Sequence, residues 1–190
     1  MNPPVNAVLL YRDDGPASLL LGRVGAAMPW LLALIGMVVP AVVASAGLRR
    51  SALLVAVIWA VVVGGVSSRA AHSGRIDWLA VPILRTGEYA VIAMTGLAAD
   101  VSPPLVFVLL CAIAFHDYDT VDRVRQGRAV DADRFAALRL LGLGWDGRLL
   151  VLAVGFAAGH LDVVFIAGTA YLWLLFAVES AYGWLQRRSA

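Results

Sequence analysis

The sequence predicts an all-α membrane protein, a bundle of about six transmembrane helices with one short cytoplasmic amphipathic helix. Hydrophobic residues make up 61% of the chain and charged residues 15%, with a mean hydropathy of +0.83, which is far more apolar than a soluble domain. Several separate apolar runs approach the ~20 residues that cross a hydrocarbon core of ~30 Å. With 190 residues, the chain has room for a single membrane domain, residues 1–190, and no second soluble domain.

The first 24 residues precede the long apolar runs and mix leucines with Arg12, Asp13 and Asp14. We expect this segment, residues 1–24, to lie along the membrane surface as an interfacial arm, or else to be a solvated arm. It lacks a basic start followed at once by a short apolar core, so no cleavable signal peptide is expected.

The helix bundle is predicted over residues 26–185, from apolar runs of near-membrane length. These runs are Ala26 to Ala46, Ala52 to Val66, Trp78 to Ala98, Pro104 to Phe115, Leu149 to Gly159 and Val163 to Trp184. The fourth run is short, and we expect its helix to continue through His116 to Arg125. The fifth is also short, which predicts a helix that is tilted, kinked at its glycines or partly covered by its neighbours.

An arginine-rich segment, residues 117–148, separates the fourth and fifth runs and carries six arginines. By the positive-inside tendency it is cytoplasmic, as are both termini, although Arg49 and Arg50 give the opposite signal. The spacing of apolar and charged residues between Gly127 and Arg148 predicts a surface helix. The glycine-rich turn that starts at Gly142 is either structural or allows close approach of a ligand.

Ionisable residues from three predicted helices should meet on one side of the bundle. Arg85 and Glu88 share a face of the third helix, and Glu179 lies in the corresponding half of the sixth. On the fourth helix His116 shares a face with Asp119 and Arg123. We therefore expect a polar cavity open to the cytoplasm. The alternative is that these charges neutralise one another in pairs or extend to water, with no ligand role.

Such a cavity suits the handling of phosphorylated lipids. His116, Asp119 and Glu88 are the candidate catalytic residues, and acids at this spacing could hold Mg²⁺, which prefers oxygen ligands and often bridges to phosphate. The candidate metal ligands are Asp117, Asp119 and Asp122. The candidate substrate-binding residues are Arg85, Arg123, Arg125, Asp77, Trp145 and Arg148, of which the arginines could bind phosphate oxygens.

Other function classes find little support. The formal charge of +2 and the scattered arginines argue against nucleic acid as a partner. The single cysteine, Cys111, excludes a disulfide framework and a cysteine-based metal site. There is no phosphate-binding loop of the Walker type, no dinucleotide fingerprint, no nucleophile elbow and no zinc-protease motif.

Three motifs carry a resemblance to a known family over nearly the whole chain. They are residues 74–89, with Gly74, Arg75, Asp77, Pro82, Arg85 and Glu88; residues 116–125, from His116 to Arg125; and residues 144–148, from Gly144 to Arg148. Together they resemble an actinobacterial membrane domain of unknown function. That family is usually found C-terminal to a CDP-alcohol phosphatidyltransferase domain, and the arginine-only use of basic residues is typical of a GC-rich bacterium.

The resemblance implies work in phospholipid or envelope-lipid synthesis, but it supplies no residue roles. CDP-alcohol phosphotransferases carry Asp-x-x-Asp-Gly-x-x-Ala-Arg followed by Gly-x-x-x-Asp-x-x-x-Asp. This chain keeps Asp119 and Asp122 at the first spacing, has Arg123 in place of the glycine, and lacks the rest. We therefore expect a diverged relative or a partner of that enzyme class.

The leading hypothesis is a bacterial inner-membrane protein that binds or transfers CDP-linked or lipid-phosphate headgroups, with membrane lipids as partners. The alternative is a non-catalytic scaffold for a separate phosphatidyltransferase or for a second copy of the chain. Glycine-rich faces at Gly64, Gly65, Gly155 and Gly159 would serve that packing. A small transporter, in which the buried charges form an ion or proton path, is a third reading.

Overall fold

The computed structural model describes residues 11–24, 28–46, 50–70, 74–125 and 141–188. These ranges contain seven α-helices and one 3₁₀ helix, and no β-strand lies within them. The predicted all-α class is confirmed. The elements are α2 (Pro16–Leu21), α3 (Pro29–Ser45), α4 (Arg50–Val66), η1 (Asp77–Leu79), α5 (Ala80–Ala98), α6 (Pro103–Arg125), α8 (Gly144–Ala158) and α9 (Leu161–Arg188).

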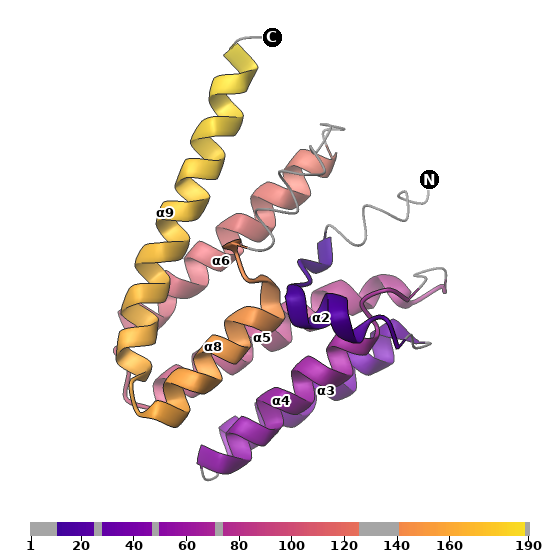
Figure 1. Cartoon of the computed structure of the whole chain (residues 1–190), viewed down its shortest axis with the longest axis vertical. Helices are drawn as coiled ribbons and strands as arrows, with labels where there is room; N and C mark the ends of the chain where they lie inside the picture. Colours follow the sequence, from indigo (N-terminus) through magenta and orange to yellow (C-terminus); the bar gives the residue numbers. More distant parts are fainter. Residues whose placement is uncertain (1–10, 25–27, 47–49, 71–73, 126–140, 189–190) are drawn as a thin grey trace.

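The long helices pack in three layers (Figure 1). Helices α5 and α8 form the middle layer, with the α3–α4 hairpin on one side and α6 with α9 on the other. The short helix α2 lies across α4 and the beginning of α8. Segments from opposite ends of the sequence therefore meet beside the middle layer.

Local sequence explains where several helices begin and end. Proline opens α2, α3 and α6, where its missing N–H is not needed and its fixed φ suits the first turn. Gly159 ends α8 in the left-handed conformation, with φ of 74°, which glycine adopts without steric cost. The His160 amide then donates to the Gly155 carbonyl at 2.9 Å and closes the turn into α9.

The expectation of about six transmembrane helices was wrong. In the described part of the chain, two helical stretches are long and apolar enough to cross a membrane, Pro103–Asp122 of α6 and Leu161–Ala181 of α9. Helices α3 and α4 have 17 residues each and α8 has 15, which at ~1.5 Å per residue falls short of ~30 Å. Helix α5 is longer, at 19 residues, but Arg85 and Glu88 interrupt its apolar sequence.

The two long apolar helices are mostly uncovered by the rest of the protein. Only 28% of the α6 stretch and 22% of the α9 stretch is buried, whereas the core helix of a soluble protein would be mostly buried. Large apolar side chains on them, such as Phe107, Leu174 and Val178, are exposed. Exposed apolar surface of this extent favours association with a membrane.

Three of the glycines singled out for packing between proteins, Gly64, Gly65 and Gly155, are used within the chain. Gly64 faces Gly36 of α3 and the indole ring of Trp145, Gly65 lies against α2, and Gly155 lies against Val164. These faces are not free for a partner. Most of the predicted amphipathic helix, at residues 126–140, lies outside the described residues.

Candidate functional site

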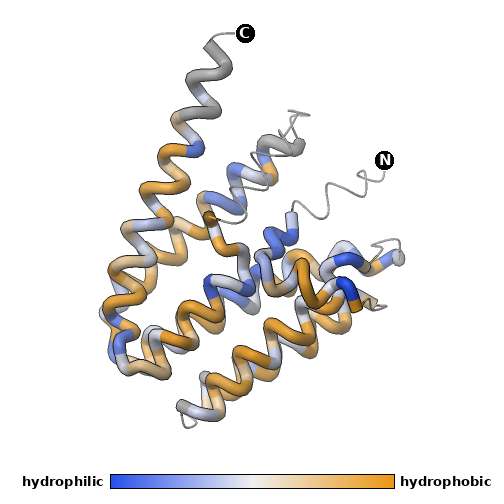
Figure 2. The backbone as a smooth tube through the Cα atoms, viewed as in Figure 1, coloured by the Kyte–Doolittle hydropathy of each residue, from blue (hydrophilic) through white to orange (hydrophobic). Residues whose placement is uncertain are grey.

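Charged side chains from distant parts of the sequence gather in the interior. Figure 2 shows the hydrophilic N-terminal segment beside the hydrophilic beginning of α8. We call the set that meets there the charge network. Its members are Asp13 before α2, Arg85 and Glu88 on α5, His116 and Asp117 on α6, Arg148 on α8 and Glu179 on α9.

Arg148 is the centre of the charge network. Its Nε donates to Glu88 Oε1 at 2.6 Å, and its Nη1 donates to Asp13 Oδ2 at 2.9 Å and to the Gly142 carbonyl at 3.2 Å. Its Nη2 is buried and has no hydrogen-bond partner among the described residues. One side chain thus joins α8, α5 and the N-terminal segment and keeps one donor group unused.

Arg85 joins the same acids to α6. Its Nη1 lies 3.3 Å from Glu88 Oε2 and 3.6 Å from Asp13 Oδ2. Its Nη2 lies 3.1 Å from Asp117 Oδ1 and donates to the Tyr11 carbonyl at 3.1 Å. The side chain is 13% exposed, so these ion pairs are only weakly screened by water.

His116 lies between two carboxylates from opposite ends of the chain. Its Nε2 is 3.9 Å from Asp13 Oδ1, and its Nδ1 is 3.4 Å from Glu179 Oε2, an ion-pair distance without hydrogen-bond geometry. The imidazole stacks on Phe176 with ring centroids 4.1 Å apart. Tyr89 Oη donates to Asp117 Oδ2 at 2.5 Å, which fixes the adjacent carboxylate.

A second ionic cluster anchors the N-terminal segment beside the charge network. Arg12 Nε pairs with Asp14 Oδ2 at 2.9 Å, and its Nη atoms donate to Ser67 Oγ and the Gly64 carbonyl. Trp145 Nε1 donates to Asp14 Oδ1 at 2.9 Å. We call residues 11–15 the N-terminal strap, because side chains of α5 and α8, the Gly64 carbonyl of α4 and the Ser67 hydroxyl hold it inside the bundle.

Asp146 supplies the cap of α2 from a different helix. One carboxylate oxygen accepts from the Gly15 amide and the other from the Ser18 amide, at 2.5 and 2.9 Å. Helix α2 has no side-chain cap of its own, so Asp146 satisfies amides that would otherwise be unpaired.

The backbone is strained where the strap meets α8. Asp13 and Leu143 both adopt positive φ, 48° and 65°, a conformation that costs a residue with a Cβ about 1 kcal/mol or more. The Trp145 amide donates to the Asp13 carbonyl at 3.1 Å and links the two. Gly144, with φ of 64°, lies so close to Gly15 that a Cβ would overlap its backbone nitrogen. Tertiary contacts hold this junction in place.

The electrostatics of Asp13 follow from its partners. Burial alone would raise the pKa of its carboxyl, but the positive charge of Arg148, the nearby imidazole of His116 and the charge of Arg85 outweigh burial. The pKa of Asp13 is therefore held well below its ordinary value, and the carboxylate stays ionised.

Five of the predicted site residues meet in the charge network, namely Glu88, Arg85, His116, Asp117 and Arg148. Trp145 is fully buried in the adjacent cluster. Asp77 lies in η1, where its carboxylate accepts from the Gly74 amide at 2.7 Å. Asp119 and Asp122 are partly exposed on the last turns of α6. Arg123 and Arg125 end the same helix, and their side chains lie outside the described residues.

Sequence reasoning missed the strap as part of the site. Asp13 contacts both arginines and His116, yet it precedes every long apolar run. The available signal was the triplet Arg12, Asp13 and Asp14 next to leucines, which is also typical of a solvated arm. In the structure Arg12 is fully inaccessible, whereas Leu20 is exposed. The N-terminal segment therefore buries its charged residues and leaves this leucine on the surface.

The charge balance of the network is unequal, since four carboxylates face two guanidinium groups and one imidazole. Among the described residues, no group of three or more histidine, cysteine or acidic side chains is arranged to hold a metal ion. Mg²⁺ commonly binds through one or two carboxylates together with phosphate oxygens, and an acid such as Asp117 fits that mode.

Comparison with known proteins gives one match. The model of a family described as a family of unknown function (DUF5941) covers residues 7–190. No curated protein and no solved structure matches the chain.

Proposed function

Since this chain belongs to a family of unknown function, DUF5941, its activity must be argued from the site, and we propose that it binds phosphorylated lipid headgroups at the charge network. The proposal places the protein in a bacterial inner membrane, with several passes, both termini in the cytoplasm and the network open to that side. The apolar surface of α6 and α9 supports the membrane part of it.

The observation that carries the proposal is the unused donor group of Arg148. A guanidinium that is buried and incompletely paired is costly, and a phosphate oxygen is the acceptor that it fits best. Arg85 pairs with the same two carboxylates, those of Asp13 and Glu88, and would bind further oxygens of the headgroup. Both arginines are oriented by carboxylates and so are positioned before a ligand arrives.

Charge balance predicts that a cation accompanies the headgroup. A phosphate brings further negative charge to a network in which carboxylates already outnumber arginines, so binding is favoured when Mg²⁺ binds with it. Asp117 would then share the ion with phosphate oxygens.

We further propose that binding serves headgroup transfer of the phosphatidyltransferase type, in phospholipid or envelope-lipid synthesis, with CDP-linked lipids as ligands. His116 supports this, because an imidazole between the carboxylates of Asp13 and Glu179 is placed to carry a proton and donate it to a reacting group. A CDP-alcohol phosphatidyltransferase is the partner expected beside it.

Lipid binding by the purified protein in nanodiscs tests the proposal. We expect phosphatidic acid and CDP-diacylglycerol to be retained at least tenfold better than diacylglycerol, with Mg²⁺ increasing retention. Arg148→Met should abolish the preference, Arg148→Lys should keep part of it, and Arg69→Met, at an exposed arginine, should not change it. Equal retention of charged and neutral lipids by the wild-type protein would refute the proposal.

A second candidate is the non-catalytic scaffold. It is favoured by the pairing of both arginines with internal acids, since arginines that are already paired within the protein can simply hold helices together. Co-purification with an intact phosphatidyltransferase, together with no headgroup preference in the nanodisc assay, would select it over the first.

A further inference from the structure

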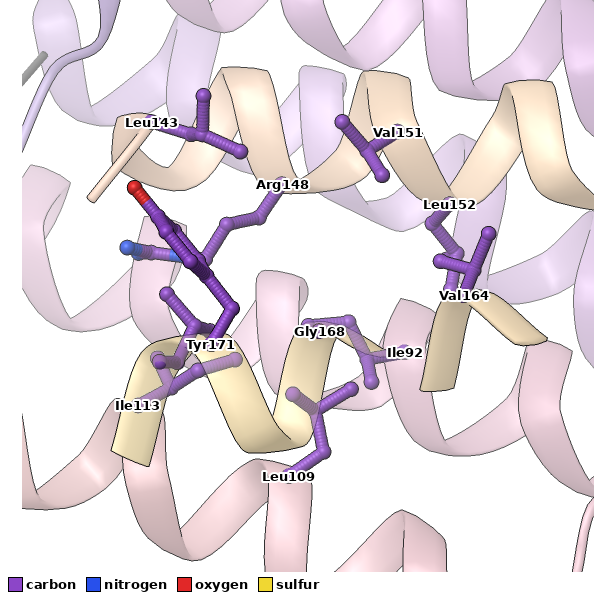
Figure 3. Close-up of a pocket in the computed structure, with 11 residues that line it drawn as sticks. Ile92, Leu109, Ile113, Leu143, Arg148, Val151, Leu152, Val164, Gly168 and Tyr171 are labelled. Atoms are coloured by element: carbon purple, nitrogen blue, oxygen red, sulfur yellow. The ribbon is translucent and has the colours of Figure 1, made fainter. Parts of the chain in front are cut away.

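A half-buried apolar pocket lies directly beside Arg148. Four helices line it, α5, α6, α8 and α9, and its volume is about 60 Å³ (Figure 3). Its walls are Ile92, Leu109, Ile113, Leu143, Val151, Leu152, Val164, Gly168, Tyr171 and Leu172. Among the described residues Arg148 is the one charged residue that lines it, and it lies with Tyr171 at the same end of the pocket.

The chemistry of this pocket changes along its length. Arg148 Nη2 is buried and unpartnered among the described residues, and it offers a donor and a positive charge at one end. Beyond it the walls are aliphatic, and apolar cavities of this kind stay dry and take apolar guests. A charged end joined to an apolar channel is complementary to an amphiphile with an anionic head.

The pocket opens onto the protein surface between α8 and α9. Val151 and Tyr171 are each 44% exposed, and the Gly168 side of α9 is open, because a Cβ built there meets no atom within 4 Å. The open side continues into the exposed apolar surface of α9, where Leu174 and Val178, three and seven residues after Tyr171, are uncovered. A hydrocarbon chain could therefore enter from the membrane and need not fit wholly inside.

We propose that this pocket is the tail-binding site of an anionic membrane lipid, whose phosphate pairs with Arg148 while the first part of one acyl chain lies between α8 and α9. This inference rests on the proposed headgroup function and adds the source and the orientation of the ligand. Tyr171 has the role of a lid residue at the polar end, because its hydroxyl donates to the Leu141 carbonyl at 2.9 Å and holds the ring there.

Gly168→Leu tests the tail site, because the new side chain fills the open part of the pocket without touching the charge network. The matched control is Ala170→Leu, two positions along the same helix at an exposed site outside the pocket lining. Binding of phosphatidic acid and of glycerol 3-phosphate is measured for both variants in nanodiscs, and their folding is checked by thermal unfolding.

We expect Gly168→Leu to weaken phosphatidic acid binding at least tenfold and to leave glycerol 3-phosphate binding unchanged, with no effect of Ala170→Leu. Phosphatidic acid carrying a photoreactive group near the start of its acyl chain should label α8 or α9 in the wild-type protein and lose that labelling in Gly168→Leu. If Gly168→Leu binds phosphatidic acid normally while Arg148→Met does not, the tail site is wrong and the headgroup proposal stands. If neither lipid nor glycerol 3-phosphate binds the wild-type protein, both are wrong.

Discussion

Arg148 Nε lies 2.6 Å from Glu88 Oε1, a contact that joins α8 to α5 across 60 residues of sequence. Neither side chain is appreciably accessible, with 4% of Arg148 and none of Glu88 exposed. Removing one partner leaves the other as a buried charge, whose cost greatly exceeds the worth of the pair itself. A variant that removes only one of the two side chains should therefore be strongly destabilised.

We predict that Arg148→Met lowers the free energy of unfolding by about 3–5 kcal/mol, because Glu88 and Asp13 lose their shared cation. The double variant Arg148→Met with Glu88→Leu should be less destabilised than the sum of the two single variants, since their mutual dependence is removed. Denaturant or thermal unfolding in detergent measures this. Strict additivity of the two changes would show that the pair is not coupled.

The second prediction concerns pH. The pKa of Asp13 is lowered from an ordinary value of 3.8, so below that value the unfolded chain takes up a proton that the folded chain does not. The stability that Asp13 contributes is thus fully present above about pH 4 and is lost as the pH falls further. We expect the difference in unfolding free energy between the wild type and Asp13→Asn to shrink over that range. A difference that stays constant from neutral to acidic pH would contradict the assignment.

The third prediction compares two helical glycines. A Cβ on Gly64 would lie 2.8 Å from the Trp145 ring, whereas one on Gly168 would meet nothing within 4 Å. Gly64→Ala should therefore destabilise by about 1–3 kcal/mol through overpacking. Gly168→Ala should be neutral or stabilise by up to about 1 kcal/mol, because alanine is the better helix former. The measurement is the unfolding midpoint of each variant. Equal midpoints for Gly64→Ala and Gly168→Ala would contradict the close contact between Gly64 and Trp145.

The fourth prediction concerns the cap that α8 supplies to α2. Asp146→Ala removes the acceptor of the Gly15 and Ser18 amides and should cost about 0.5–2 kcal/mol, the range for a helix cap. Hydrogen exchange of residues 15–22 should accelerate, while exchange in α9 stays unchanged. Asp162→Ala, at an exposed acid in the first turn of α9, is the control. Unaltered exchange in Asp146→Ala would mean that other contacts hold α2 in place.

Apolar periodicity and length were enough to predict the helices but not which of them could cross a membrane. Each predicted run corresponds to an observed helix, and the fourth continues through His116 to Arg125 as expected. Crossing depends on the uninterrupted apolar length of a helix, and on this measure α3, α4 and α8 are too short. Runs of neighbouring apolar residues look alike whether a helix faces lipid or is covered by other helices.

The candidate site was predictable where charge interrupts an apolar helix. Arg85, Glu88 and His116 stand out because such residues need partners. Asp13 could not be found in this way, since its burial depends on Arg148, which is 135 residues distant. The residues next to Asp13 in the sequence carry no information about a contact so distant, and only the fold brings Asp13 and Arg148 together.

The strap also bears on how the protein assembles. Residues 11–15 precede α8 in the sequence, and their acceptors and donors on α8 follow more than a hundred residues later. Contacts of such long range form slowly, because the loop that they close must be ordered before they contribute. During synthesis the strap can therefore dock only after α8 has been made.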